Sequence, residues 1–124
     1  MNKKVMALVA VIALVAILGV CLVACNAESV SKKLEGKDYS VAALSEKSTG
    51  VGATVYNVVK GIEGFKEGLV AAKGSDSVVV VWFNDTDSAQ KLENSKVVTA
   101  FAKKVSRVGK VVYLGTEQGV KDAK

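Results

Sequence analysis

The sequence predicts a small α+β domain with an antiparallel sheet, placed after an N-terminal apolar segment. Valine-rich runs at residues 78–83 and 111–114 are typical of buried strands. Apolar residues recur at helical spacing across 49–62 and 88–105, which predicts one helix before and one helix after the central strands in sequence. Strands and helices are therefore mixed along one short chain.

The first element is the apolar run at residues 5–24, which follows two lysines. At about 1.5 Å per residue, a helix of this length spans roughly 30 Å. Hydropathy therefore allows three interpretations: a lipoprotein signal, an uncleaved transmembrane helix, or an ordinary secretory signal. The residues that close the run distinguish between them.

Leu22, Val23, Ala24 and Cys25 place a branched apolar residue, a tolerant position and a small residue before a cysteine. This pattern resembles the lipobox of bacterial lipoproteins. Cys21 does not fit it, because a bulky valine precedes that cysteine. The resemblance implies cleavage between Ala24 and Cys25 and a covalent lipid, such as palmitate, on Cys25. The protein would then be held on the extracytoplasmic side of the cell membrane.

These boundaries divide the chain into a signal peptide at 1–24, a lipidated cysteine with a flexible tether at 25–36, and a domain at 37–124. The signal carries two of the 17 basic residues, so the mature chain has 15 basic residues against 12 acidic ones and a net charge of +3. A domain of this size buries a modest core. The charge is that of an ordinary lysine-containing surface, although it also suits an anionic membrane.

The mature chain contains no histidine, no proline and no cysteine other than Cys25. Cys/His metal sites, a Ser-His-Asp triad and a cysteine nucleophile are therefore excluded. We expect no cofactor besides the lipid on Cys25, and a fold without internal disulfides.

Within the domain, residues 39–44 form a β-branched and apolar run that predicts the first strand. Residues 49–62 have helical periodicity but are rich in valine and glycine, so this helix depends on burial of its apolar face. Glycines at 61 and 64 favour its termination, and a second strand is predicted at 68–73.

The turn residues at 74–77 join this second strand to the strongest strand, at 78–83, as a β-hairpin. Asn84 to Asp87 supply capping side chains for an amphipathic helix at 88–105. Residues 107–114 return to a β pattern, with a bulge predicted at Gly109-Lys110. Thr116 is expected to cap a last short helix at 117–123.

The resulting order is strand, helix, strand, strand, helix, strand, which is the ferredoxin-like β-α-β-β-α-β arrangement. In that arrangement four antiparallel strands carry both helices on one face. If residues 68–73 were helical, the alternative would be a three-stranded α/β sandwich.

The sheet face away from the helices is the clearest candidate interface. With Ser75-Asp76 as the hairpin loop, Leu69 would pair with Trp82 and Ala71 with Val80. Lys73 lies on the same face and marks it as the more solvent-exposed one. The predicted interface consists of Leu69, Val78, Val80 and Trp82. Such a patch suits an envelope protein partner or a homodimer; alternatively, the tether or the C-terminal helix covers it.

Other motifs predict less. Gly50-x-Gly52 lacks the third glycine and the lysine-serine pair of a phosphate loop. Asp85 and Asp87 could bind calcium with Asn84, although helix capping explains them as well and their spacing departs from an EF-hand. Nucleic-acid binding is not expected, because stacking aromatic residues are few.

Residues 109–116 resemble the ending of small uncharacterised bacterial lipoproteins, and this resemblance implies no activity. We therefore expect a non-enzymatic binding or interaction module on a lipid anchor. The alternatives are an accessory envelope enzyme that uses carboxylates such as Asp85, Asp87 and Glu93, or a carrier of a small ligand.

Overall fold

The computed structural model of the chain describes residues 27–124. Ala24 and Cys25, on which the predicted anchor depends, lie outside the described residues, as does Cys21. The described elements follow the chain in this order: α2 (Ala27–Glu35), β1 (Ser40–Ala43), α3 (Val51–Val59), β2 (Phe65–Lys73), β3 (Asp76–Phe83), α4 (Thr86–Glu93), α5 (Lys96–Phe101), β4 (Lys104–Val108), β5 (Val111–Gly115) and α6 (Glu117–Ala123).

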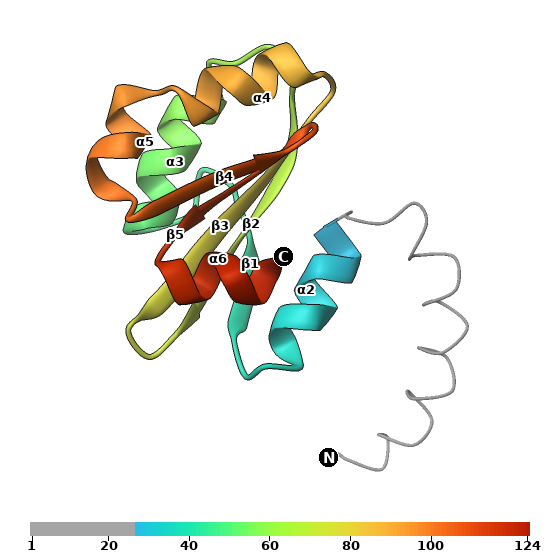
Figure 1. The fold of residues 1–124 in the computed structure, drawn as a ribbon, viewed down its shortest axis with the longest axis vertical. Helices are drawn as coiled ribbons and strands as arrows, with labels where there is room; N and C mark the ends of the chain where they lie inside the picture. The colour runs from blue at the N-terminus through green and yellow to red at the C-terminus, as the bar shows by residue number, and fades with distance from the viewer. Residues whose placement is uncertain (1–26) are drawn as a thin grey trace.

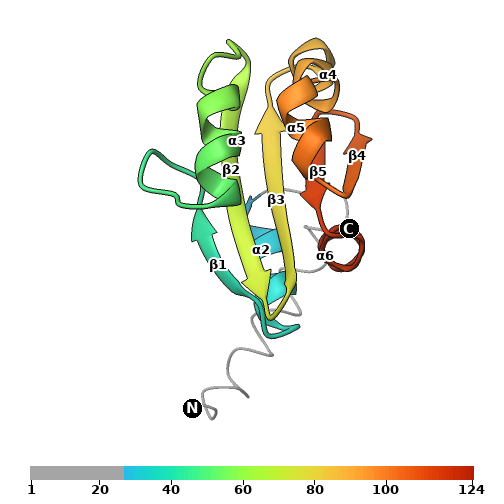
Figure 2. The ribbon, with the colours of Figure 1, turned by 90° about the vertical axis from the view of Figure 1, so that its left-hand side faces the viewer.

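The five strands form one open antiparallel sheet in the order β1-β2-β3-β5-β4. Figures 1 and 2 show α2 and α6 on one face of this sheet and α3, α4 and α5 on the other. The edges of the sheet are β1 and β4. The α+β class and the antiparallel sheet are thus confirmed.

Strand β3 lies at the centre of the sheet, and its last six residues are all buried. Val78, Val80 and Trp82 belong to the core under α2 and α6, whereas Val79, Val81 and Phe83 belong to the core under α3, α4 and α5. A strand covered on both faces has apolar residues at every position rather than at alternate ones. This explains the continuous valine run.

The ferredoxin-like arrangement is wrong for the described residues. That arrangement has four strands and helices on one face, whereas here five strands have helices on both faces. The three-stranded sandwich is wrong as well, because residues 68–73 lie in β2 as predicted. Both faces of β2 and β3 are apolar, so each face needs its own cover.

The extra strand, β4, spans the end of the predicted helix at 88–105 and the start of the predicted strand at 107–114. Two short helices occupy the first part of that predicted helix, and β4 begins at Lys104. Val98 and Val105 pack in the same core from different elements, so the helical spacing continued past the end of the helix. The predicted bulge is in fact a hairpin turn: Val108 pairs with Val111, and Gly109 between them has φ +61°.

The β2–β3 hairpin is confirmed, with a register two residues from the predicted one. Lys73 pairs with Asp76 and Leu69 with Val80, so the loop is Gly74-Ser75 rather than Ser75-Asp76. Gly74 has φ +60°, which suits the first loop position of a type II′ turn. An even shift leaves every side chain on its predicted face.

The segment predicted as a flexible N-terminal tether is largely helical. Residues 27–35 form helix α2, with Val30 and Leu34 buried against the sheet, so the folded domain begins ten residues before the predicted boundary at Lys37. A helix that contributes only two apolar residues has the composition of a linker, which is why its packing was not predicted. In the part of the chain from Ala27 onward, no helix has the length and apolarity needed to span a bilayer.

Candidate functional site

The predicted interface residues are brought together, but they are not exposed. Leu69, Val78, Val80 and Trp82 are between 0% and 6% exposed and lie under α2 and α6. The prediction of an open apolar patch is therefore wrong for the described residues, and the alternative, in which the N-terminal segment and the C-terminal helix cover it, is confirmed. This face is part of the core.

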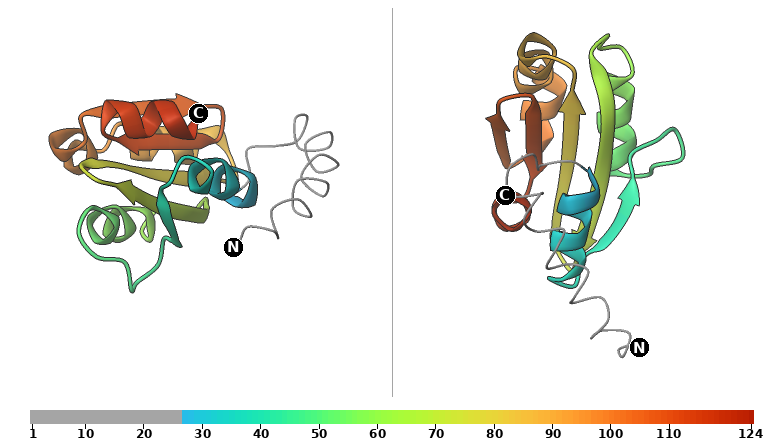
Figure 3. Two further views of the ribbon diagram at one scale, coloured as in Figure 1. Left: turned by 90° about the horizontal axis from the view of Figure 1, so that it is seen from below. Right: turned by 90° about the vertical axis from the view of Figure 1, so that its right-hand side faces the viewer.

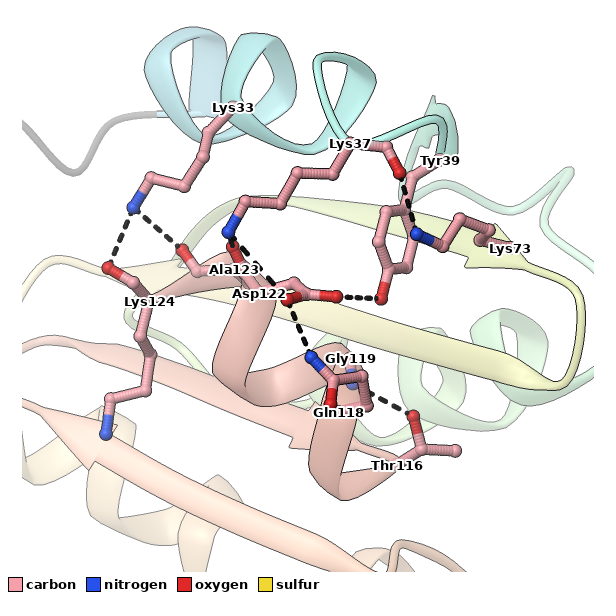
Figure 4. A network of polar contacts seen from close by, with 10 residues as sticks. All are labelled: Lys33, Lys37, Tyr39, Lys73, Thr116, Gln118, Gly119, Asp122, Ala123 and Lys124. Atoms are coloured by element: carbon pink, nitrogen blue, oxygen red, sulfur yellow. Dashed lines mark hydrogen bonds and ion pairs between the residues drawn. The ribbon is translucent and has the colours of Figure 1, made fainter.

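The two covering helices are joined by a polar cluster that we call the terminal clamp: Lys33, Lys37, Tyr39, Asp122 and the backbone of Ala123 and Lys124. The Tyr39 hydroxyl donates to Asp122 Oδ2 over 2.7 Å, and the Lys33 ammonium donates to the Lys124 carbonyl over 2.7 Å and to that of Ala123 over 3.3 Å (Figure 4). Lys37 lies 3.7 Å from the Asp122 carboxylate. The clamp links segments from opposite ends of the described chain.

In the clamp, Tyr39 and Asp122 each favour the ordinary protonation state of the other. Burial and the hydrogen bond to Asp122 raise the pKa of Tyr39 to about 12. The same hydrogen bond lowers the pKa of the Asp122 carboxyl, with help from Gln118 and Lys37. Lys73 lies 5.2 Å from the centre of the Tyr39 ring and donates to the Lys37 carbonyl. A protonated phenol facing an ionised acid stabilises the fold and leaves neither group poised for proton transfer at neutral pH.

The carboxylates considered for catalysis or calcium do not converge. Asp85 caps α4 by accepting from the Ser88 amide over 2.7 Å, and this hydrogen bond lowers the pKa of Asp85. Glu93 pairs with Arg107 at 2.8 Å. Asp85 and Glu93 stand at opposite ends of α4, on the order of 12 Å apart by helix rise. Among residues 27–124, no three His, Cys, Asp or Glu side chains are grouped closely enough to hold a metal ion.

The two glycines of the weak phosphate-loop motif have different structural roles: Gly50 serves the backbone conformation and Gly52 the packing. Gly50 adopts φ +60° where the chain enters α3, and a side chain at Gly52 would collide with Val70 and Ser48. Gly52 therefore lets α3 approach β2. No capping side chain occupies the start of α3.

Two hollows border the sheet edge at β1, and neither was anticipated from the sequence. The larger, which we call the α2-side groove, has a volume of about 500 Å³. Its walls come from the first turn of α2, the end of β1, the start of β2 and Tyr56 of α3, and they include Ala27, Val41, Ala43, Leu44, Phe65 and Leu69. Glu28, Lys66 and Glu67 supply its charged groups. The groove is mainly apolar with a polar rim.

The smaller hollow, the α3-side groove, has a volume of about 330 Å³ and lies where β1 meets the loop that leads to α3. Its lining is mainly apolar, from alanines at 42, 43, 71 and 72 and from Val70, with hydroxyl groups from Ser40, Ser45, Ser48 and Thr49; Lys47 is its charged residue. Figure 3 shows β1 at the margin of the sheet, with α2 on one side and this loop on the other. The candidate site is therefore the β1 edge with a groove on each side.

This site was missed because it depends on where two strands end. β1 has four residues and β2 has nine, so β1 covers only part of the β2 edge. The last backbone bond between the two segments runs from the Leu44 amide to the Gly68 carbonyl. The short uncharged run at 40–43 was the only available sequence signal for an open edge.

Comparisons of the chain with protein-family models, curated proteins and solved structures find no match.

Proposed function

We propose that this chain is a lipid-anchored protein of the bacterial envelope whose domain binds another protein and carries out no catalysis. The observation that carries the anchor is the Leu22-Val23-Ala24-Cys25 sequence, which fits a lipobox where the neighbouring Cys21 does not. Two or three acyl chains on Cys25 would make membrane residence stable.

The start of the fold supports a location close to the membrane surface. Helix α2 begins at Ala27, so only Asn26 separates it from Cys25. Two residues reach at most about 7 Å. If Cys25 is lipidated, the first turn of α2 and the α2-side groove lie next to the lipid headgroups.

A binding role is favoured over a catalytic one by the state of the polar residues. The acids at Asp85, Glu93 and Asp122 are each held by a structural partner, and the mature chain has no histidine or free thiol. By contrast, the β1 edge combines open backbone with two adjacent grooves. Open edges of this kind are suited to binding.

The anchor is tested by growing cells that express the full chain with an alkyne-bearing palmitate and detecting the labelled protein. We expect label on the wild type and on Cys21→Ala, which is the matched control, and none on Cys25→Ala. Mass spectrometry of the mature N-terminus should find Cys25 as the first residue. Label that persists on Cys25→Ala would refute the anchor.

A further inference from the structure

The two edge strands of the sheet differ in how they are protected. β4 carries Lys104 and Arg107, and Arg107 is fixed by its ion pair with Glu93. β1 has the sequence Ser-Val-Ala-Ala, with no charge and no proline. Proteins usually guard an edge strand with charges, proline or a bulge, because unpaired backbone groups invite a further strand. β1 lacks each of these protections.

The hydrogen-bonding pattern between β1 and β2 determines which backbone groups of β1 remain available for a further strand. Ser40 pairs with Ala72 and Ala42 with Val70, and the next inward residue, Leu44, donates to Gly68. In an antiparallel pair, alternate residues direct both their N–H and C=O to the same neighbour. Val41 and Ala43 therefore direct their backbone groups away from β2, toward the open side.

The grooves lie where the side chains of an added strand would point. Successive side chains of a strand alternate between the two faces of a sheet. Next to β1, one set would point to the α2 face, where Val41 and Ala43 border the α2-side groove. The other set would enter the α3-side groove, against Ser45, Ser48 and Lys47.

We propose that β1 is the docking edge for an extended polypeptide segment of a partner protein, which pairs with Val41 and Ala43 as a sixth strand. The groove chemistry specifies the segment: apolar residues on the α2 side, alternating with hydroxyl or acidic residues that face Lys47 on the α3 side. The pairing rests on the binding role proposed above.

A second copy of this chain is a poorer occupant than a foreign segment. Self-pairing would join two four-residue strands whose side chains are mostly alanine and serine. These contribute far less contact than the roughly 1,200–2,000 Å² of a standard stable interface. An extended segment with larger side chains fills both grooves.

The test uses the full chain in lipid nanodiscs and a phage-displayed library of random peptides, with empty nanodiscs as the background. Enriched peptides are synthesised, and their affinities are measured for the wild type, Ala43→Pro and Ala43→Ser. Proline removes the outward N–H of Ala43 without removing an inward ladder bond, and edge strands tolerate it. Serine keeps the amide and is the matched control.

We expect the enriched peptides to alternate as specified and to bind Ala43→Pro at least about tenfold more weakly than Ala43→Ser, which keeps the amide. Thermal melting checks that both variants fold. Peptides N-methylated at alternate residues give a second measurement on the wild type. One set of methyl positions should abolish binding and the other should not, because only one set faces β1.

Absence of enrichment over empty nanodiscs, equal binding to Ala43→Pro and Ala43→Ser, or equal effects of the two methylation sets would each overturn the proposal. A dimer in the wild type that becomes a monomer in Ala43→Pro would assign the edge to a second copy instead. Labelling of Cys25 is independent of all these outcomes, so failure of the strand pairing is distinguishable from failure of the anchor.

Discussion

The two faces of the sheet are closed by different parts of the chain. The face under α3, α4 and α5 is covered by internal segments, and its core is aliphatic with Phe83, bordered by the partly buried Tyr56, Phe65 and Phe101. The face under α2 and α6 is covered by the first and last described helices, and its core holds Trp82 and two tyrosines. Within residues 27–124, α3, α4 and α5 are joined to packed elements on both sides, whereas α2 and α6 are joined to one on a single side only. The terminal clamp supplies long-range contacts that compensate for this difference.

The largest expected effects come from truncating one buried leucine in a helix on each face of the sheet. Leu34 of α2 and Leu92 of α4 are both fully buried, one on each face. Leu34→Ala and Leu92→Ala should each lower the free energy of unfolding by about 3 kcal/mol, measured by denaturant titration. Only Leu34→Ala should change the native fluorescence of Trp82, the single tryptophan. A similar fluorescence change in Leu92→Ala would show that the two faces are not independent.

Gly119→Ala tests how closely α6 approaches the sheet. A Cβ at Gly119 would collide with the backbone carbonyl of Ser77, which cannot move aside as a flexible side chain could. We expect destabilisation of about 2 kcal/mol, although alanine ordinarily favours a helix by about 1 kcal/mol over glycine. Gly61→Ala is the control, because its Cβ would meet nothing closer than 3.6 Å. Thermal melting distinguishes them, and a stabilised Gly119→Ala would contradict the packing described for α6.

The terminal clamp predicts that the stability of the face under α2 and α6 depends on pH. The pKa of Tyr39 is raised to about 12, so its contribution is complete below pH 10 and is lost as pH rises from 10 toward 12. The pKa of Asp122 is lowered from 3.8, so its contribution is complete above that value and is lost in more acidic solution. Stability measured against pH should therefore fall at both extremes.

Tyr39→Phe should cost about 1 kcal/mol at neutral pH, because the hydrogen bond to Asp122 is lost while the ring remains. It should also remove the alkaline loss of stability that belongs to the clamp. If urea titrations at pH 8 and pH 11 show the same pH dependence in the wild type and in Tyr39→Phe, the clamp does not stabilise this face.

The smallest effect is expected at the exposed side of α2. Glu28 and Lys32 are 3.6 Å apart, but their side chains are 78% and 61% exposed. Glu28→Gln should change the free energy of unfolding by less than about 0.5 kcal/mol, because exposed ion pairs contribute little. A larger loss would mean that α2 is held by its surface charges rather than by Val30, Leu34 and the clamp.

The elements that could be predicted are those whose local sequence pattern matches the burial they have in the fold. β1, α3, β2, β3 and α6 were predicted at nearly the observed positions, and so were the capping roles of Asp85 and Thr116. These depend on turn chemistry, capping residues and apolar runs that lie close together in sequence. Helix α2 was missed because its two buried residues lie in a polar stretch. Their burial depends on contacts with Trp82 and α6, which are distant in sequence.

The candidate site could not be predicted for a related reason. The β1 grooves exist because strands of four and nine residues end at different places, and a local pattern fixes strand ends least well. The Tyr39–Asp122 contact joins residues far apart in sequence, so no spacing or motif indicates it. The single helix predicted at 88–105 shows the converse error, because a continuous apolar spacing ran through the ends of α4 and α5 and into the start of β4.

The four consecutive valines of β3 do not by themselves fix the register of this strand against its neighbours, and nearby glycines do. Because residues 78–81 are all valine, sliding β3 past β2 by two residues would bury almost the same apolar surface. Gly68 opposes Val81 where a side chain would collide with Leu44, and Gly115 opposes Val78 where one would collide with the Ser77 backbone. The turn at Gly74 therefore fixes the register of β2 against β3, and Gly115 fixes that of β5 against β3, while Gly68 makes room for Leu44. Moving Gly115 by two positions would be a way to shift the register of β5 on β3 while leaving the composition unchanged.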